Sequence, residues 1–210
     1  MNLIDFFANA YKETSLFVIS LEMIAFIFGI ASVYYAKKEN ILVYPTGLVA
    51  TCITVFLLYR AGYFGDMVVN FYYSVMSIYG WYIWSQPTVN NSVLPISRTN
   101  KREKIIGLML FIVTIVVIFV VYRIFAQAIE VENYIDVFTS GVFFTAMYFM
   151  ALKKIENWTL WIVADIISIP LYAYRGLGIL SLQFLIFTIM AVQAYIEWKK
   201  TLDMPKMATK

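Results

Sequence analysis

Long apolar segments alternate with short polar stretches along the whole chain. Seven of these segments come close to the ~20 residues that a helix needs to cross about 30 Å of hydrocarbon. They span residues 15–36, 41–59, 65–84, 105–125, 134–152, 157–174 and 178–198. The pattern predicts an all-α integral membrane protein with seven transmembrane helices.

The composition leaves no room for a large soluble domain. Hydrophobic residues make up 62% of the chain and charged residues 14%, with a mean hydropathy of +0.76, whereas soluble domains average roughly a quarter charged residues. Residues 1–14 carry acids where a signal peptide has bases, and they predict a short interfacial segment. Residues 85–104 are polar, contain two prolines and end in basic residues, which predicts a cytoplasmic linker.

Lysine and arginine residues gather on one side of the predicted membrane. Of the 16, twelve lie in the loops after the first, third and fifth segments and in the tail 199–210: Lys37, Lys38, Arg98, Lys101, Arg102, Lys104, Lys153, Lys154, Lys199, Lys200, Lys206 and Lys210. The other four are Lys12, Arg60, Arg123 and Arg175. By the positive-inside rule, the N-terminus faces outward and the C-terminus faces the cytoplasm. The net charge of +3 follows from this topology, and we expect no nucleic-acid partner.

A short motif recurs in the two halves of the chain. The letters KKEN at 37–40 return as KKIEN at 153–157, each before an apolar segment that ends in Tyr-Arg. The match predicts that residues 15–84 and 126–198 are two three-helix repeats running in the same direction, joined by a connector helix at 105–125. The alternative is that Lys-Lys before a membrane helix is only a topology signal.

One face of the segment 157–174 carries polar and aromatic residues. Helical spacing of three and four aligns Trp158, Trp161, Asp165, Ser168 and Tyr172. A carboxylate in mid-membrane costs on the order of 2.5 to 3.5 kcal/mol, so Asp165 is expected to face a cavity or a partner. The central parts of the seven segments hold no Lys or Arg. Asp165 is therefore either neutral and hydrogen-bonded or paired with a cationic substrate, whereas Trp158 alone would equally fit an interfacial anchor.

Polar side chains recur on two further segments. Segment 65–84 carries Asn70, Tyr73, Ser77, Trp81 and Trp84 at spacings of three and four. Segment 178–198 carries Gln183, Thr188 and Gln193. Any one of them could simply join two helices by a hydrogen bond worth about 0.6 to 2 kcal/mol. Together the stripes predict a binding site between the helices, and Pro170, with Pro45 and Gly47, is expected to supply matching helix breaks beside it.

The residues on these stripes resemble the PnuC family of vitamin-precursor transporters. The resemblance covers almost the whole chain and is carried by ENWTLWIVADIIS, by the following LYAYRGL, and by SIYGWYIW at the end of segment 65–84. It implies a three-plus-one-plus-three bundle similar to the SWEET sugar transporters, assembled as a homotrimer in the bacterial inner membrane. It also implies that Asn157, Trp158 and Trp161 belong to the substrate site.

The family resemblance further implies facilitated diffusion of nicotinamide riboside or, in related members, of thiamine, with a cytoplasmic kinase that traps the product. Tryptophan rings suit such flat cations through cation–π attraction. This chain departs from the pattern of the riboside carriers, which tend to have Asn at the positions of Ala50, Ser77 and Asp165, Gln at Asn70 and Glu at Gln183. Nicotinamide riboside is the expected substrate because it is the usual substrate of the resembled family. Thiamine is its competitor, because the departures fall on the polar stripes that would contact the riboside.

Other classes of function fit the sequence less well. A membrane enzyme would need His, Cys or paired acids near one membrane face, but the chain has no His and one Cys. A scaffold or receptor has no use for an acid beside tryptophans in mid-membrane. We therefore expect a transporter with no catalytic residues, no metal and no cofactor.

Overall fold

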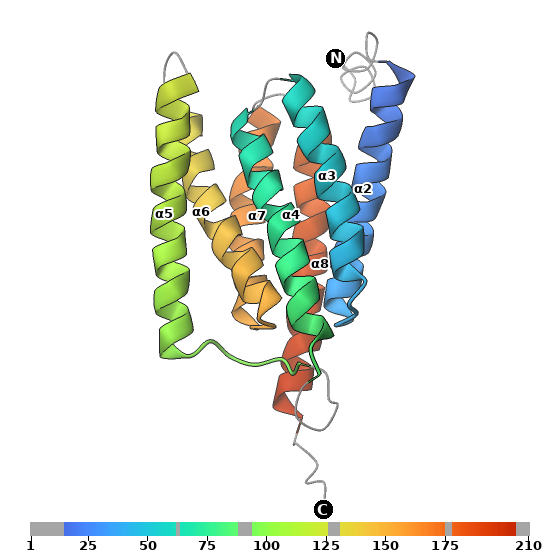
Figure 1. Ribbon diagram of the computed structural model, residues 1–210, viewed down its shortest axis with the longest axis vertical. Coiled ribbons are helices and arrows are strands. Elements are labelled where there is room, and N and C mark those ends of the chain that lie inside the picture. The colour runs from blue at the N-terminus through green and yellow to red at the C-terminus, as the bar shows by residue number, and fades with distance from the viewer. Residues whose placement is uncertain (1–14, 62–63, 88–93, 126–130, 175–177, 205–210) are drawn as a thin grey trace, which may run out of the picture.

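The computed structural model describes residues 15–61, 64–87, 94–125, 131–174 and 178–204, which form seven long helices (Figure 1). These are α2 (Leu16–Lys37), α3 (Val43–Ala61), α4 (Phe64–Ser85), α5 (Lys101–Phe125), α6 (Val131–Ala151), α7 (Glu156–Tyr174) and α8 (Gly178–Asp203). Each helix overlaps one predicted segment, so the predicted all-helical fold is confirmed. Residues 1–14, the predicted interfacial segment, lie outside the described residues.

Two helices extend well beyond their apolar segments. Helix α5 begins at Lys101 rather than at 105, and α8 continues to Asp203 rather than ending at 198. Asn100 and Glu103 form a reciprocal cap at the start of α5, since each side chain accepts a hydrogen bond from the backbone N–H of the other, at 2.9 and 2.8 Å. An apolar run predicts the part of a helix inside hydrocarbon, whereas caps set where the helix begins and ends.

Five of the seven helices in the described part of the chain are long and apolar enough to span a membrane: α2, α3, α5, α6 and α8. Helices α4 and α7 are not among them. They have the length, at 22 and 19 residues, but they carry the Asn, Ser, Asp and Trp residues of the predicted stripes. The protein is therefore an all-α, multi-pass membrane protein, and α4 and α7, which carry two of the predicted polar stripes, fall outside the five candidate spans.

The helices run alternately down and up in Figure 1, so that α2, α4, α6 and α8 all finish at the lower end. Consecutive helices pack on one another in two series, α2–α3–α4 and α6–α7–α8. The series are joined where α4 packs on α6 and where α8 packs on α2. Helix α5 lies against α6 and makes only slight contact with α4. The six other helices thus close a ring, and α5 stands at its side.

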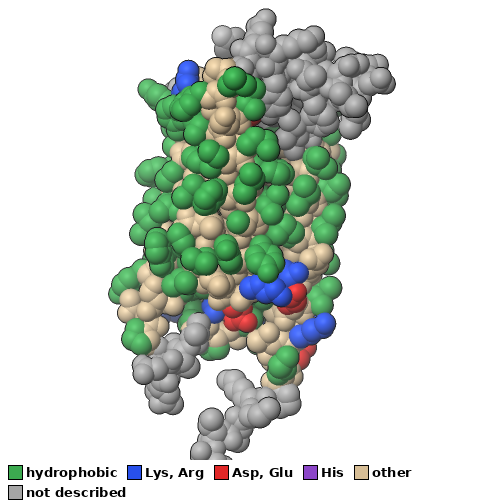
Figure 2. Space-filling model, turned by 90° about the vertical axis from the view of Figure 1, so that its right-hand side faces the viewer, with side chains coloured by type: hydrophobic (Ala, Val, Ile, Leu, Met, Phe, Trp, Pro, Cys, Tyr) green, Lys and Arg blue, Asp and Glu red, His purple; other side chains and the backbone are tan. Residues whose placement is uncertain are grey.

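Charged side chains gather at the lower end of the bundle, below a broad hydrophobic face (Figure 2). There the Glu197 carboxylate on α8 pairs with the ammonium groups of Lys37 and Lys38, at 3.0 and 3.3 Å. We call this the lysine-rich end. Its ion pairs join the end of α2 to α8.

The two predicted helix breaks are not equivalent. Pro45 lies in the first turn of α3, which begins at Val43, where a missing N–H and a fixed φ fit the helix without distortion. Pro170 lies inside α7. The prediction of matching interruptions was wrong, because only Pro170 removes a hydrogen bond from a helix interior.

Candidate functional site

Helix α7 turns its polar stripe inward. Packed between α6 and α8, it buries Asn157, Trp158, Ala164, Asp165, Ser168, Leu171 and Tyr172. The residues recur at helical spacing, so a single face contains them. The predicted stripe therefore faces the interior of the bundle.

Asp165 is the most unusual member of this face. Only 2% of the residue is exposed, and its carboxyl group forms no hydrogen bond or ion pair with another described residue. A buried carboxyl without a partner is costly whether it is charged or neutral. A partner from outside the chain would offset this cost.

Several further polar atoms on α7 lack hydrogen-bond partners among the described residues. They are the Oδ1 atom of Asn157, the indole Nε1 atoms of Trp158 and Trp161, and the Oγ atom of Ser168, all buried. The Asn157 amide nitrogen is in use, since it donates to the Lys154 carbonyl. Native proteins contain few such atoms, and each calls for an explanation such as a ligand. Their position on one helix face makes a polar ligand the simplest explanation.

Aromatic rings surround Trp161. Its indole lies 6.0 Å from the Tyr73 ring on α4 and 5.4 Å from the Phe143 ring on α6. Phe184 on α8 continues the row, at 5.9 Å from Phe143 and 5.1 Å from Tyr172. The five rings come from four helices and form an aromatic row along the face that carries Asp165 and Ser168.

Trp158 lies apart from this row. Its ring packs edge to face against Trp198 at 5.4 Å, and only 1% of the residue is exposed. An interfacial anchor would be exposed at a membrane surface. That alternative for Trp158 was wrong, because the side chain is part of a buried cluster with Trp198 and Ala194.

The predicted stripe on α4 divides between different surroundings. Tyr73 faces Trp161, whereas Trp81 is 41% exposed and Trp84 is buried and bonded to the Ala151 carbonyl. The Ser77 hydroxyl is buried against Gly47 of α3, 3.6 Å from where a Cβ would stand. The stripe therefore follows no single lining surface.

Two other predicted residues have identifiable neighbours. The backbone carbonyl of Asn70 accepts a hydrogen bond from the Ser74 hydroxyl at 3.1 Å. The Gln183 amide nitrogen on α8 lies 3.9 Å from where a Cβ of Gly29 would stand, so this side chain reaches toward α2. Neither contact joins these two residues to the aromatic row.

The described basic residues lie at helix ends, in turns or in the linker, and none of them belongs to the inward face of α7. Arg60 and Arg123 occupy the last turns of α3 and α5, where each guanidinium lies over a phenylalanine ring, at 5.9 and 5.8 Å. Helix α7 contains no Lys or Arg, and Arg175 lies outside the described residues. The face of α7 thus offers a carboxyl and aromatic rings, but no cation for a phosphate.

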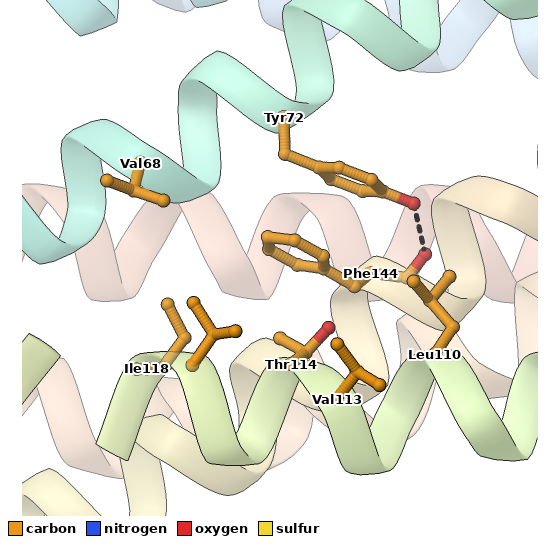
Figure 3. A pocket seen from close by; sticks show the side chains of 8 residues that line it. Val68, Tyr72, Leu110, Val113, Thr114, Ile118 and Phe144 are labelled. Carbon is orange, nitrogen blue, oxygen red and sulfur yellow. Dashed lines mark hydrogen bonds between the residues drawn. The ribbon is translucent and has the colours of Figure 1, made fainter. Parts of the chain in front are cut away.

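A separate cavity of about 170 Å³ lies between α4, α5 and α6 (Figure 3). Its lining is Val68, Tyr72, Leu110, Val113, Thr114, Val117, Ile118 and Phe144. The Tyr72 hydroxyl at its edge already donates to the Phe144 carbonyl, at 3.0 Å. The lining includes no charged side chain and no residue of α7, so this cavity does not suit a charged, hydroxyl-rich ligand.

Within the described ranges, no group of three or more His, Cys, Asp or Glu side chains is arranged to hold a metal ion. The chemistry of the α7 face is therefore that of hydrogen bonding, ring stacking and charge.

Comparison with known proteins agrees with a transport role. The family model described as nicotinamide mononucleotide transporter matches residues 19–200. The nicotinamide riboside transporter PnuC of Escherichia coli (strain K12) is 24% identical over 201 residues, covering 85% of this chain and 84% of its own. The transporter of the same name from Neisseria mucosa is 25% identical over 196 residues, covering 86% of this chain and 72% of its own.

A solved structure has the same fold. The crystal structure of the vitamin B3 transporter PnuC superposes with a TM-score of 0.70 at 22% identity, covering 95% of this chain and 87% of the other. Because the family model spans most of the sequence, the chain belongs to the nicotinamide mononucleotide transporter family, a family of membrane transporters and not of enzymes.

Proposed function

We propose that this transporter carries nicotinamide riboside across the membrane by facilitated diffusion, binding it on the inward face of α7. The observation that carries the proposal is the coincidence, on that one face, of a buried, unpartnered carboxyl at Asp165 and unpartnered polar atoms at Asn157, Trp161 and Ser168. The relatives at 24% and 25% identity are nicotinamide riboside transporters by name, which supports the choice of substrate.

The site matches the chemistry of a riboside with a positively charged ring. The rings of Trp161, Tyr73 and Phe143 offer π-faces that attract a flat cation. The Asp165 carboxylate supplies an opposite charge. The free Oγ atom of Ser168 and Oδ1 atom of Asn157 can bond ribose hydroxyl groups. Tyr172 follows Ser168 by four residues and is buried on the same face of α7. Trp158, Ser77 and Gln183 have neighbours outside the aromatic row, and we propose that these three residues and Asn70 contact the substrate when the helices move.

Thiamine is the second candidate. It is also a flat cation, and Asp165 favours it because a carboxylate suits any permanent positive charge, whereas the riboside carriers of the resembled pattern tend to have Asn there. The names of the relatives favour the riboside. We therefore keep the riboside as the proposed substrate and thiamine as its alternative.

We also propose that α2–α4 and α6–α8 are two parallel repeats with α5 as the connector. Support comes from contacts within the first half that recur within the second half when 114 is added to each residue number. Glu39 and Lys153 are also separated by 114 residues. Tyr44 packs edge to face on Trp84 at 5.1 Å, and Trp158 packs in the same way on Trp198 at 5.4 Å. In this register Lys37 corresponds to Ala151, so the Lys-Lys motifs are not aligned with each other.

The same ring of helices supports transport by rocking of one three-helix half against the other. The third helix of each series packs on the first helix of the other, as a twofold axis along the membrane normal requires. We propose that the lysine-rich end faces the cytoplasm of a bacterial cell, with the N-terminus outside. We also propose that the protein assembles as a homotrimer in the inner membrane and that a cytoplasmic kinase traps the riboside after transport.

The absence of basic residues on α7 predicts discrimination against phosphates. In liposomes containing the purified protein and no imposed ion gradient, we expect exchange of nicotinamide riboside at least about tenfold faster than exchange of its 5′-phosphate, because a buried phosphate needs Lys or Arg partners. Protein-free liposomes control for leakage. Faster exchange of the phosphate, or a strict need for a sodium or proton gradient, would contradict the proposed function.

A further inference from the structure

The turns that follow α2 and α6 meet at the lysine-rich end. Glu39 and Lys153 occupy equivalent places in these turns, with φ values of 53° and 49°. Their backbone N–H groups donate to the carbonyls of Ala36 and Met150, three residues earlier in each case. The Lys153 ammonium pairs with the Glu39 carboxylate at 3.3 Å. In the proposed register of 114 residues these positions are equivalent, so opposite charges meet where the two halves adjoin.

The Lys153 side chain is fully buried, whereas the Glu39 side chain is 30% exposed. The ammonium also lies 4.3 Å from the centre of the Trp84 ring. Burial lowers the pKa of Lys153, and the neighbouring Glu39 carboxylate opposes that change. A buried ammonium that loses its partner is strongly unfavourable. The pair therefore favours the arrangement in which the halves touch.

Two tryptophans at the lysine-rich end each donate a hydrogen bond to the end of a helix in the other half. The Trp84 indole N–H of α4 donates to the Ala151 carbonyl at the end of α6, at 3.1 Å. The Trp198 indole N–H of α8 donates to the Lys37 carbonyl at the end of α2, at 3.2 Å. Each indole thus satisfies a carbonyl that the end of a helix leaves without an intrahelical partner. The two bonds brace the turns that carry Glu39 and Lys153.

The linker before α5 fixes one of these turns. The Ser97 N–H donates to the Lys153 carbonyl at 3.1 Å, and the Ser97 carbonyl accepts from the Ile155 N–H at 3.0 Å. Residues 94–100 run beneath the bundle to the start of α5 in Figure 1. Backbone hydrogen bonds join Lys153 to the end of α6 and to the linker. Separation of the two halves must therefore break the contact between Lys153 and Glu39.

We propose that Glu39 and Lys153 form a latch that closes the bundle at the lysine-rich end and must separate for the substrate to pass there. The inference rests on the proposed function, since it assigns this end as one of the two mouths of the transport path. The Glu39 carboxylate can turn to water when the latch opens because it is partly exposed. The Lys153 ammonium gains access to water only through the opening itself.

The latch is tested by the accessibility of a buried reporter. In full-length protein reconstituted in lipid, with Cys52→Ser removing the single cysteine, Ala151→Cys places a thiol at a fully buried position beside the latch. Adding Glu39→Gln is expected to raise the rate of labelling by a water-soluble maleimide about tenfold, through a larger open population. A second reporter, Val137→Cys, is buried near the other end of α6, and its labelling should not change.

Glu103→Gln is the matched control. It neutralises a carboxylate that pairs with Lys154, the residue next to the latch, at 2.9 Å, but joins that turn to α5 instead of crossing the halves. Its labelling rate should stay within about twofold of the parent. Equal labelling of Glu39→Gln and Glu103→Gln would overturn the latch, as would faster labelling of Val137→Cys, which would indicate general loosening.

Lys153→Met provides a second variant that removes the buried charge and keeps an apolar stem on the Trp84 ring. It is expected to fold and to label faster at Ala151→Cys, and slow labelling of this variant would overturn the latch even where Glu39→Gln fails to assemble. Nicotinamide riboside binding is measured on the parent sample. Failure of the parent to bind contradicts the proposed function while leaving the labelling comparison intact.

Discussion

Replacing Asp165 with asparagine is expected to weaken binding of a cationic vitamin by about 10- to 100-fold. A carboxylate about 4 Å from a positive ring attracts it by about 4 kcal/mol at an effective dielectric constant of 20, before the opposing cost of desolvation. A loss of about 1.4 to 2.8 kcal/mol remains as a net estimate. Because the Asp165 carboxyl has no partner among the described residues, the amide should not destabilise the fold. Calorimetric titration of the purified variant measures the change.

Asp136→Asn is the matched control for this substitution. Asp136 is also buried, but it accepts a hydrogen bond from the Tyr122 hydroxyl at the contact between α5 and α6. Its amide variant should lose thermal stability and keep its affinity for the vitamin. Unchanged affinity in Asp165→Asn would contradict ion pairing and would instead indicate that a protonated carboxyl donates a hydrogen bond, a role that an amide can take over.

Replacing Trp161 with alanine is expected to weaken binding by about 2- to 30-fold through loss of the cation–π attraction, which is worth about 0.5 to 2 kcal/mol. Removal of the indole also leaves a gap between Tyr73 and Phe143, so some loss of thermal stability should accompany the loss of affinity. Trp161→Phe separates the two effects, because it keeps a ring in the row and removes the unpartnered N–H group. Titration with the riboside and thermal unfolding are measured on both variants.

Trp81→Ala is the control for the tryptophan series. Trp81 is 41% exposed on α4, outside the aromatic row, and its loss should leave affinity unchanged. If Trp81→Ala and Trp161→Ala changed affinity equally, Trp161 would have to be regarded as a packing residue with no specific contact to substrate.

The helices could be predicted because long apolar runs have few alternatives to a membrane helix. Their ends could not. Helix α5 begins at Lys101, among charged residues, because Asn100 and Glu103 cap it, and an apolar pattern does not detect such caps. Pro45 was misread as a helix break for a related reason. Its effect depends on its position relative to the start of α3, which hydropathy does not locate.

The α7 face could be predicted because Asp165 contrasts with its apolar surroundings, and a period of three to four residues then identifies its neighbours. Phe143 and Phe184 were missed because an aromatic residue in an apolar helix gives no contrast. Their place opposite Trp161 and Tyr172 follows from the packing of α6 and α8 on α7. The stripe on α4 was overextended, since spacing alone does not distinguish the side facing Trp161 from the sides facing α3 or the outside.

Calorimetric titration of the purified protein with nicotinamide riboside, repeated in competition with thiamine, tests the central claim most directly. We expect saturable binding of the riboside, weakened by Asp165→Asn and Trp161→Ala and kept by Asp136→Asn and Trp81→Ala. Absence of riboside binding to a correctly folded protein, or riboside binding that both α7 variants leave unchanged, would contradict the claim that this transporter carries the vitamin precursor on the inward face of α7.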